Sequence, residues 1–461
     1  MKSRLSVVDL AWGYSAQLLN LAAGVLLIPL LALHAVPEVV GLWLVFITLV
    51  SLAQLIELGL QPTLARAVAY AHAGVSGLRS EGLAAPVASD GRADEATLLA
   101  LQRTSKRLYR YAAALTCALL LVTGTMYVRH VLRVNPGVTI PHVYLAWTLF
   151  AAGTVLNNYF GYYVAFIQGR GRVTQCNQVM VLGKTVFLVL GAMFTIFDGG
   201  LLGLGAASFI AAFCGRLLAM KFYTDGKVAD GSAAPSVDWR LLLPNAARLI
   251  IVQFGTFLIL RATVLIGANF LSLTEVASYG ITVQVLMVLS GLASLTLNLQ
   301  MPRMNAAQAR GDKVALRGLL GSAVLLAWLV FWGGAAVSLV AGDVILEALG
   351  KGTRMLPPGP LLVLTATYFL EMNHSVFATY LTTLNRVPFM AAAIVSGACT
   401  VVLALAFCDA GLGIWGLILA PALVQATYNN WKWPLEALRD VGADLWTILR
   451  AGGSALTSRS S

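Results

Sequence analysis

The chain of 461 residues is 59% hydrophobic and only 11% charged, and its mean hydropathy is +0.80. Soluble domains carry roughly 25% charged residues, so this chain has too few charges to cover a soluble globule of its size, and we expect the lipid bilayer to solvate most of its surface. The formal net charge is +11. Because the basic residues lie between apolar runs, they indicate membrane topology and contacts with anionic lipid, and no nucleic-acid partner is expected.

Apolar runs long enough to cross the hydrocarbon core, which takes about 20 residues of helix, follow one another along the chain. The first run begins after Met1-Lys2-Ser3-Arg4 and is too long for the apolar region of a signal peptide. Long alternation of apolar and polar residues is absent, which favours helices over a barrel. We therefore predict an all-α membrane protein with about twelve transmembrane helices, at approximately 10–33, 40–60, 112–128, 143–167, 179–197, 201–220, 246–270, 276–299, 319–340, 361–384, 389–407 and 412–431.

Basic residues are distributed unevenly between the predicted loops. If the N-terminus is cytoplasmic, the loops on the opposite side hold only four of the 31 Lys and Arg residues: Arg129, Arg133, Lys351 and Arg354. Lys184 and Arg261 lie inside spans, and the others, Arg216 among them, are grouped with the cytoplasmic segments. This asymmetry follows the positive-inside rule, which predicts an even number of spans and cytoplasmic termini.

Two long cytoplasmic connections organise the chain. The connection between spans six and seven is rich in Gly, Ser and Pro and is typical of a linker. We expect an N-terminal six-helix lobe at 1–222, a cytoplasmic linker at 223–243, a C-terminal six-helix lobe at 244–434 and a cytoplasmic C-terminal tail at 435–461. In the first connection, the leucines of Ala93–Arg110 predict an amphipathic helix that lies on the membrane surface.

Ionisable residues inside predicted spans are the strongest functional candidates, since a charge at mid-bilayer costs roughly 2.5–3.5 kcal/mol on insertion scales. Arg261 lies 13 residues after Arg248 and 14 before Glu275, which is about 20 Å from either boundary. Lys184 and Glu371 also fall near the midplane. One interpretation places Arg261 and Lys184 against an anionic substrate in a hydrated cavity between two helical bundles. The alternative is a structural ion pair, for instance between Arg261 and Glu371.

Two carboxylates are candidate coupling sites. Glu371 is a candidate coupling-ion or proton site, with Asn373 and His374 nearby on the same predicted helix, and a buried hydrogen-bonded carboxylate is the alternative. Glu57 and Arg66 flank the cytoplasmic end of span two. In an inward-open cavity Arg66 would lie at the mouth, and a positive-inside anchor is the alternative.

The polar and aromatic side chains of span four are candidates for contact with sugar rings: Asn157, Asn158, Tyr159 and Tyr162. Helix packing is the alternative role for them. The chain has no HExxH motif and no Walker A loop, and its five Cys and five His residues are scattered. We therefore expect no catalytic residues, no metal site and no cofactor, in a protein that is not an enzyme.

The second span and its flanks resemble the Wzx-type polysaccharide flippases of the multidrug/oligosaccharidyl-lipid/polysaccharide (MOP) exporter superfamily. The residues that carry the resemblance are Ile28-Pro29-Leu30-Leu31, Gly41-Leu42-Trp43, Glu57-Leu58-Gly59-Leu60 and Leu64-Ala65-Arg66-Ala67-Val68-Ala69. Two further stretches agree, Ile167-Gln168-Gly169-Arg170-Gly171-Arg172 and the region from Tyr279-Gly280 to Pro302. The likeness in span count and layout extends over essentially the whole chain.

The resemblance implies two six-helix lobes around a cationic cavity that opens alternately to each side of a bacterial inner membrane. The implied cargo is a polyprenyl-pyrophosphate-linked oligosaccharide, moved to the periplasmic leaflet for O-antigen (lipopolysaccharide) or exopolysaccharide assembly. Arg261, Lys184, Arg66 and Arg248 would then bind the pyrophosphate. Glycan polymerase and chain-length proteins are candidate partners.

The sequence departs from the family in two places and leaves rival functions open. Glu57 stands where the family usually has Asp, and Arg261-Ala262 falls where span seven often carries an Asp. A cation-coupled multidrug exporter of the same superfamily is the first rival, although two midplane cations against one carboxylate disfavour a cationic cargo. A membrane glycan polymerase or ligase is the second, and it would need a sizeable external loop that the predicted topology lacks.

Overall fold

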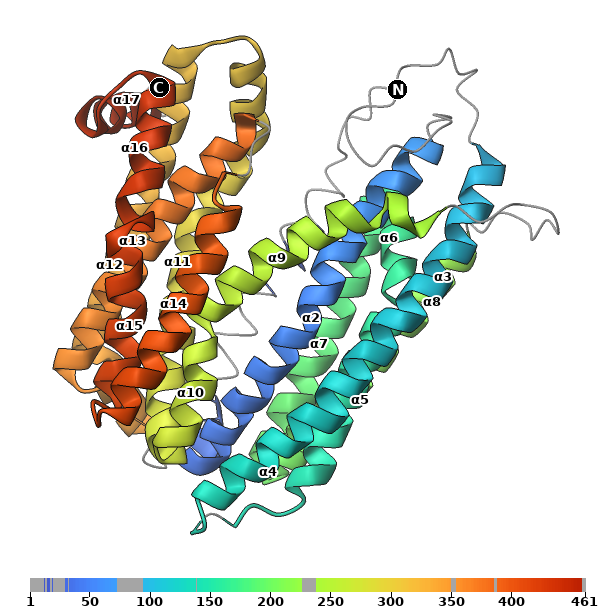
Figure 1. Cartoon of the computed structure of the whole chain (residues 1–461), viewed down its shortest axis with the longest axis vertical. Coiled ribbons are helices and arrows are strands. Elements are labelled where there is room, and N and C mark those ends of the chain that lie inside the picture. The colour runs from blue at the N-terminus through green and yellow to red at the C-terminus, as the bar shows by residue number, and fades with distance from the viewer. Residues whose placement is uncertain are drawn as a thin grey trace. The chain divides into compact units, whose positions relative to one another are not determined.

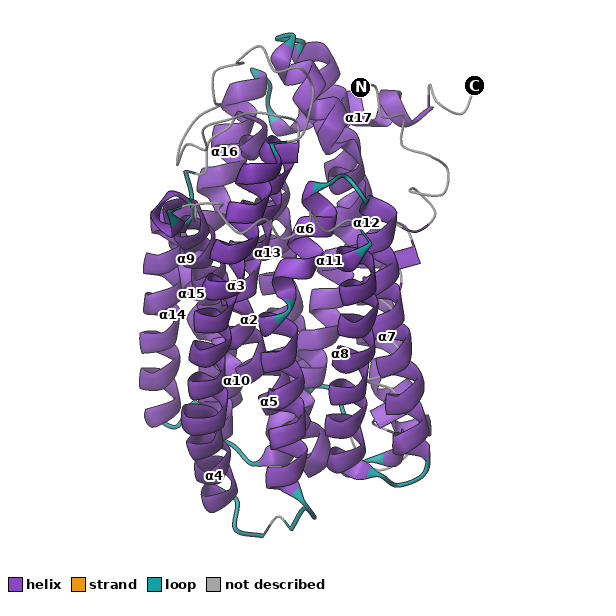
Figure 2. Cartoon of the chain, turned by 90° about the vertical axis from the view of Figure 1, so that its right-hand side faces the viewer, coloured by secondary structure: helices purple, strands orange, loops and turns teal. Residues whose placement is uncertain are grey.

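The computed structural model describes residues 12, 15–16, 19, 30–31, 33–72, 94–137, 139–225, 238–349, 354–384 and 388–457. Within these ranges the chain forms helices joined by short connections, and no described residue lies in a strand (Figure 2). The predicted all-α class is therefore confirmed.

The helices are labelled in chain order in Figure 1. Their bounds are α2 Pro37–His72, α3 Glu95–Cys117, the π-helix η1 Ala118–Gly124, α4 Thr125–Val134, α5 Val143–Tyr159, α6 Gly161–Gly169, α7 Val173–Ile196, α8 Gly200–Thr224, the 3₁₀ turn η2 Trp239–Leu241, α9 Leu243–Leu260, α10 Ala262–Phe270, α11 Leu273–Ala309, α12 Lys313–Leu349, α13 Pro358–Leu381, the 3₁₀ turn η3 Thr382–Leu384, α14 Met390–Asp409, α15 Ile414–Thr427, α16 Asn429–Val441 and α17 Leu445–Thr457.

Eight helical stretches among the described residues are long and apolar enough to cross a membrane. Each predicted span from 40–60 onward coincides with at least one helix. The predicted span at 10–33 lies almost entirely outside the described residues. Spans four and seven are each interrupted, at Phe160 and at Arg261, where α5 gives way to α6 and α9 to α10.

The chain divides into two compact units. Unit 1 comprises residues 1–35 and 45–254, and unit 2 comprises residues 36–44 and 255–461. The division falls inside α2 and inside α9, so each of these helices contributes residues to both units. The predicted lobes and linker stay predictions, since residues 226–237 of the linker lie outside the described part of the chain.

Helix α2 of unit 1 is about three turns longer than predicted. Pro62, two residues beyond the predicted end of this span at residue 60, lies inside it, and the helix continues to His72. The extra turns bury Leu64 and Val68 in an apolar cluster with Leu98 and Leu101 of α3, and this burial offsets the local cost of a proline within a helix.

The predicted surface-lying helix at 93–110 is wrong. Residues Glu95–Val134 form one continuous helical stretch of 40 residues, made of α3, η1 and α4. Asp94 caps its start by accepting hydrogen bonds from the backbone N–H and the hydroxyl of Thr97 (3.0 and 2.6 Å). The leucines that suggested contact with a membrane surface pack against protein: Leu98 and Leu101 are 3% and 0% exposed.

The predicted C-terminal tail of unit 2 contains two ordered helices. In α17, Gly452 lies directly against the backbone of Gly321 in α12, so close that a Cβ on either glycine would overlap main-chain atoms. Arg317 of α12 donates hydrogen bonds to the Val441 and Gly442 carbonyls at the end of α16 (2.9 and 2.8 Å). These contacts hold α16 and α17 against the membrane-spanning helices.

Candidate functional site

Unit 1 contains a polar cluster at the break between α5 and α6. Glu57 of α2 and Tyr109 of α3 both approach Gly161, the first residue of α6. A Cβ at position 161 would lie 2.9 Å from Glu57 Oε1 and 2.8 Å from a ring carbon of Tyr109. Only glycine leaves room for both side chains at this position.

Arg216 of α8 is the cation of this cluster. Its Nε donates a 2.8 Å hydrogen bond to Oδ1 of Asn157, and it lies close enough to Glu57 for the two charges to attract each other. Its Nη1 and the Tyr109 hydroxyl are buried without a hydrogen-bond partner among the described residues. Arg216 is therefore held by one amide and attracted by one carboxylate, with hydrogen-bonding capacity left over.

The side chains predicted to contact sugar differ in accessibility. Asn158 is 1% exposed and donates to the Thr116 hydroxyl (2.8 Å), an arrangement that joins α5 to α3. Tyr162 is 5% exposed and packs edge-on against Tyr109 and Tyr223. Tyr159 is half-buried against the ring of Phe160. Asn157 and Tyr159 are thus the more accessible members of this set.

The cations of unit 1 that were predicted to bind pyrophosphate lie on three different helices. Lys184 is half-buried in the middle of α7 and makes no hydrogen bond or ion pair with a described residue. Arg66 lies on the last turns of α2 and Arg248 on the first turns of α9, and both are exposed. Lys184 is thus the half-buried member of this set, and Arg66 and Arg248 are its exposed members.

In unit 2, Arg261 occupies the break between α9 and α10. Its backbone N–H donates to the Phe257 carbonyl (2.9 Å), and its own carbonyl accepts from the Val264 N–H three residues later (3.1 Å). Its half-buried side chain makes no ion pair with a carboxylate of the described residues, and it interacts electrostatically with the Tyr368 hydroxyl. The alternative of an Arg261–Glu371 ion pair is therefore not formed.

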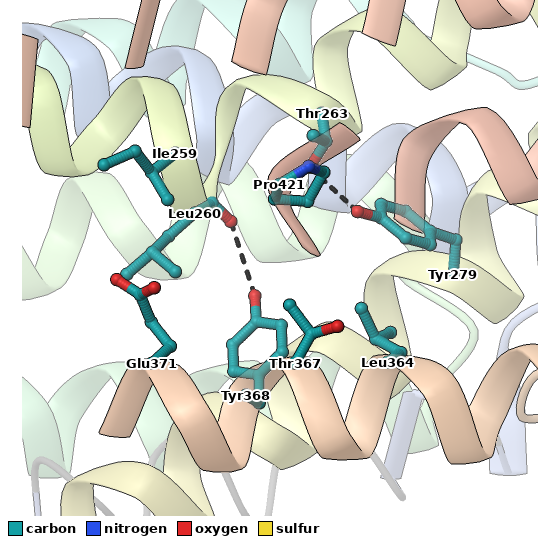
Figure 3. A pocket seen from close by; sticks show the side chains of 9 residues that line it. All are labelled: Ile259, Leu260, Thr263, Tyr279, Leu364, Thr367, Tyr368, Glu371 and Pro421. Atoms are coloured by element: carbon teal, nitrogen blue, oxygen red, sulfur yellow. Dashed lines mark hydrogen bonds between the residues drawn. The ribbon is translucent and has the colours of Figure 1, made fainter. Parts of the chain in front are cut away.

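A small pocket opens beside this break (Figure 3). Its cavity volume is only about 10 Å³, and it is lined by Ile259, Leu260, Thr263, Tyr279, Leu364, Thr367, Tyr368, Glu371 and Pro421. The Tyr279 hydroxyl donates to the Thr263 hydroxyl (2.8 Å), and the Tyr368 hydroxyl lies 3.5 Å from the Leu260 carbonyl. Among the described residues that line the pocket, Glu371 alone is charged.

Glu371 lies next to the polar side chain of His374, which in turn contacts Asn430. Its Oε2 lies 3.7 Å from Nδ1 of His374, and the same nitrogen is 3.1 Å from Oδ1 of Asn430 in α16. Asn373 accepts a hydrogen bond from the Trp328 indole instead (2.9 Å). The pocket therefore combines one carboxylate and four hydroxyls, with the His374 imidazole beside Glu371, a set of groups that can accept a proton or a small cation.

Sequence reasoning missed Arg216, Tyr109, Tyr368 and Asn430. It grouped Arg216 with the cytoplasmic cations, although position 216 falls within the predicted sixth span at 201–220. A charge inside a predicted span was the signal that could have found it. No comparable signal marks the tyrosines, since their roles come from tertiary contacts. The described residues contain no group of three His, Cys, Asp or Glu placed to hold a metal ion.

No protein-family model and no curated protein matches this chain. Among solved structures, the lipid II flippase MurJ in an inward closed conformation matches with a TM-score of 0.61 at 12% identity, over 98% of this chain and 91% of that one. An inward-facing multidrug resistance MATE family transporter of the MOP superfamily matches with a TM-score of 0.59 at 16% identity, over 99% of both chains. An outward-facing structure of such a transporter gives 0.54 at 15%, over 95% of both.

At sequence identities of 12% to 16%, these structural matches establish the fold alone. The predicted fold class, an all-α membrane protein with the fold of MOP superfamily exporters, is confirmed. The cytoplasmic position of both termini stays a prediction.

Proposed function

We propose that this chain is a flippase that moves polyprenyl-pyrophosphate-linked oligosaccharides from the cytoplasmic to the periplasmic leaflet of a bacterial inner membrane, by alternating access, for O-antigen or exopolysaccharide assembly. It acts without catalytic residues or a cofactor of its own. The fold supports transport, because it is shared with a lipid II flippase over 98% of the chain.

The observation that carries the proposal is that cations inside the helices lack carboxylate partners among the described residues. These cations are Lys184 and Arg261. An uncompensated charge in a membrane-spanning helix is costly. An anionic group that binds during transport compensates it, and a pyrophosphate supplies two or more negative charges.

The roles of the individual residues follow their accessibility. Arg261, with Lys184, Arg66 and Arg248, binds the pyrophosphate at successive stages of transport. Asn157 and Tyr159 contact the sugars, whereas the buried Asn158 and Tyr162 keep α5 and α6 in place. Glu371 is the coupling-ion site, and Glu57 is the weaker candidate because Arg216 already lies beside it. The polyprenyl tail stays in the bilayer.

A cation-coupled multidrug exporter is the second candidate function. The fold is equally that of multidrug transporters, and Glu371 in a pocket with no cation in its lining favours a positively charged ligand there. The two functions differ in the charge of the cargo and can be separated by one assay.

The test uses the purified full-length chain reconstituted in lipid vesicles. We expect a fluorescent polyprenyl-pyrophosphate-linked oligosaccharide to exchange between leaflets much faster than in protein-free vesicles, with competition from an unlabelled polyprenyl pyrophosphate. Ethidium, a cationic drug, is the matched probe and should neither move nor compete. Ethidium transport without leaflet exchange of the pyrophosphate probe would replace the flippase proposal with the exporter.

A further inference from the structure

One face of α3 carries an unusual concentration of positive charge. Arg103, Lys106, Arg107 and Arg110 are all exposed, and their spacing places them within an arc of about 100° on a helix of 3.6 residues per turn. No Asp or Glu follows Glu95 anywhere in the stretch Glu95–Val134. We call these four residues the basic face of α3.

The opposite side of the same helix is fixed to the protein. Leu98, Leu101, Tyr109 and Ala112 belong to the apolar cluster of unit 1 and are at most 7% exposed. The helix therefore cannot rotate to hide its cations without losing this packing. The basic face is a permanent feature of the surface.

The depth of the basic face in the membrane follows from the charges of the continuous stretch. Between Arg110 and Arg129 there is no charged residue, and these 19 positions cover about 28 Å of helix, close to the roughly 30 Å of a hydrocarbon core. Arg110 then lies at one boundary and Arg129 at the other. The rest of the basic face extends outward from Arg110 through the headgroup layer.

Exposed apolar side chains continue along the helix beyond the basic face. Tyr111 is 60% exposed, Leu115 59% and Val122 57%, and the guanidinium of Arg107 lies 6.0 Å from the centre of the Tyr111 ring. An interfacial tyrosine between cations and lipid-facing aliphatic residues matches the polarity gradient of a phospholipid, from phosphate to acyl chain.

We propose that the basic face of α3 binds the headgroups of anionic phospholipids of the surrounding leaflet, with Tyr111 and Leu115 against the upper acyl chains. The exposed surface of this helix suits lipids arriving laterally, because no described residue encloses it, and four cations in two turns match the charge of several phosphates. This inference does not rest on the proposed cargo, since it concerns the bilayer itself.

Native mass spectrometry of the purified full-length chain tests the proposal. The protein is incubated with phosphatidylglycerol or with phosphatidylcholine at equal concentration, and retained lipids are counted. We expect a clear excess of phosphatidylglycerol for the wild type. Arg107→Gln with Arg110→Gln should reduce phosphatidylglycerol binding at least about fivefold, the effect of one cation near an anionic surface.

The matched control removes two exposed cations from the other end of the same stretch, Arg129→Gln with Arg133→Gln, and should keep the excess. If both double variants lost phosphatidylglycerol binding equally, the binding would come from the overall positive charge of the protein, and the proposal would be overturned. Displacement of phosphatidylglycerol by millimolar inorganic pyrophosphate would overturn it too, since the face would then take free anions. Unchanged thermal denaturation of both variants shows that the fold is retained.

Discussion

The two units handle charge inside their helices in different ways. In unit 1, Arg216 donates a hydrogen bond to Asn157 and is attracted by Glu57. These contacts offset most of the free-energy cost of burying its charge. In unit 2, Arg261 has no carboxylate partner among the described residues, and Glu371 faces a pocket with His374 as its neighbour. The difference indicates that the charge of Arg216 chiefly holds helices together, whereas that of Arg261 is kept available for a ligand.

The largest expected effect is a difference in the free energy of unfolding between the Arg216 and Arg261 variants. Arg216→Gln removes a hydrogen bond from a charged donor and leaves Glu57 uncompensated, so it should lower the free energy of unfolding by about 2 kcal/mol. Arg261→Gln removes an unpaired charge and should leave stability unchanged or raise it. Chemical denaturation in detergent measures both, and equal losses would erase the distinction between the units.

A double-mutant cycle sharpens the unit 1 side of the comparison. If Glu57 and Arg216 stabilise each other, then Glu57→Gln combined with Arg216→Gln should cost less than the sum of the single changes, by about 1 kcal/mol. Glu57→Gln with Lys184→Gln is the control, since Lys184 has no partner among the described residues. Additivity in both pairs would show that Glu57 and Arg216 act independently.

Glu371 and Glu57 should also differ, in their effect on the response of transport to a cation gradient. Glu371→Gln removes the only charge of the unit 2 pocket and should abolish the response of transport to an imposed cation gradient, with stability changed by no more than about 1 kcal/mol. Glu57→Gln should keep the gradient response. Initial transport rates in vesicles with and without a proton or sodium gradient measure this, and loss of the response in the Glu57 variant alone would move the coupling site to unit 1.

The smallest effect lies outside the membrane-spanning helices, at the start of α17. The side-chain hydroxyl and backbone N–H of Thr447 donate to Asp444 and hold the pKa of its carboxyl below the usual value. A depressed folded-state pKa stabilises α17 above the unfolded pKa and loses this contribution as the pH falls through the folded one. Protease protection of the C-terminus should therefore decrease slightly in acid, and Asp444→Asn should be less protected at neutral pH and lack this change.

Apolar run lengths predicted the helices well because burial in lipid demands about 20 residues whatever the protein context. The ends and the surroundings of the helices were predicted less well. The second span was predicted to end at residue 60, whereas α2 continues through Pro62 to His72, and the leucines of α3 were assigned to lipid but pack against α2. Both errors come from tertiary packing that no local pattern encodes.

The site residues show the same limit. Position in a span was enough to single out Arg261, Lys184 and Glu371, whereas the partners that distinguish them come from helices far apart in sequence. Glu371 meets Asn430 only through His374, and Arg216 meets Asn157 across 59 positions. Sequence therefore indicates which charges need an explanation, and the packing of the helices shows which already have one.

The central claim, that Arg261 is kept in the membrane to bind an anion, is tested most directly by the leaflet exchange of a fluorescent polyprenyl-pyrophosphate-linked oligosaccharide in vesicles containing equal amounts of wild type, Arg261→Lys or Arg261→Ala. We expect Arg261→Ala to slow exchange at least about tenfold, the equivalent of about 1.4 kcal/mol, and Arg261→Lys to retain part of the rate. Wild-type exchange by Arg261→Ala at equal abundance would contradict the account.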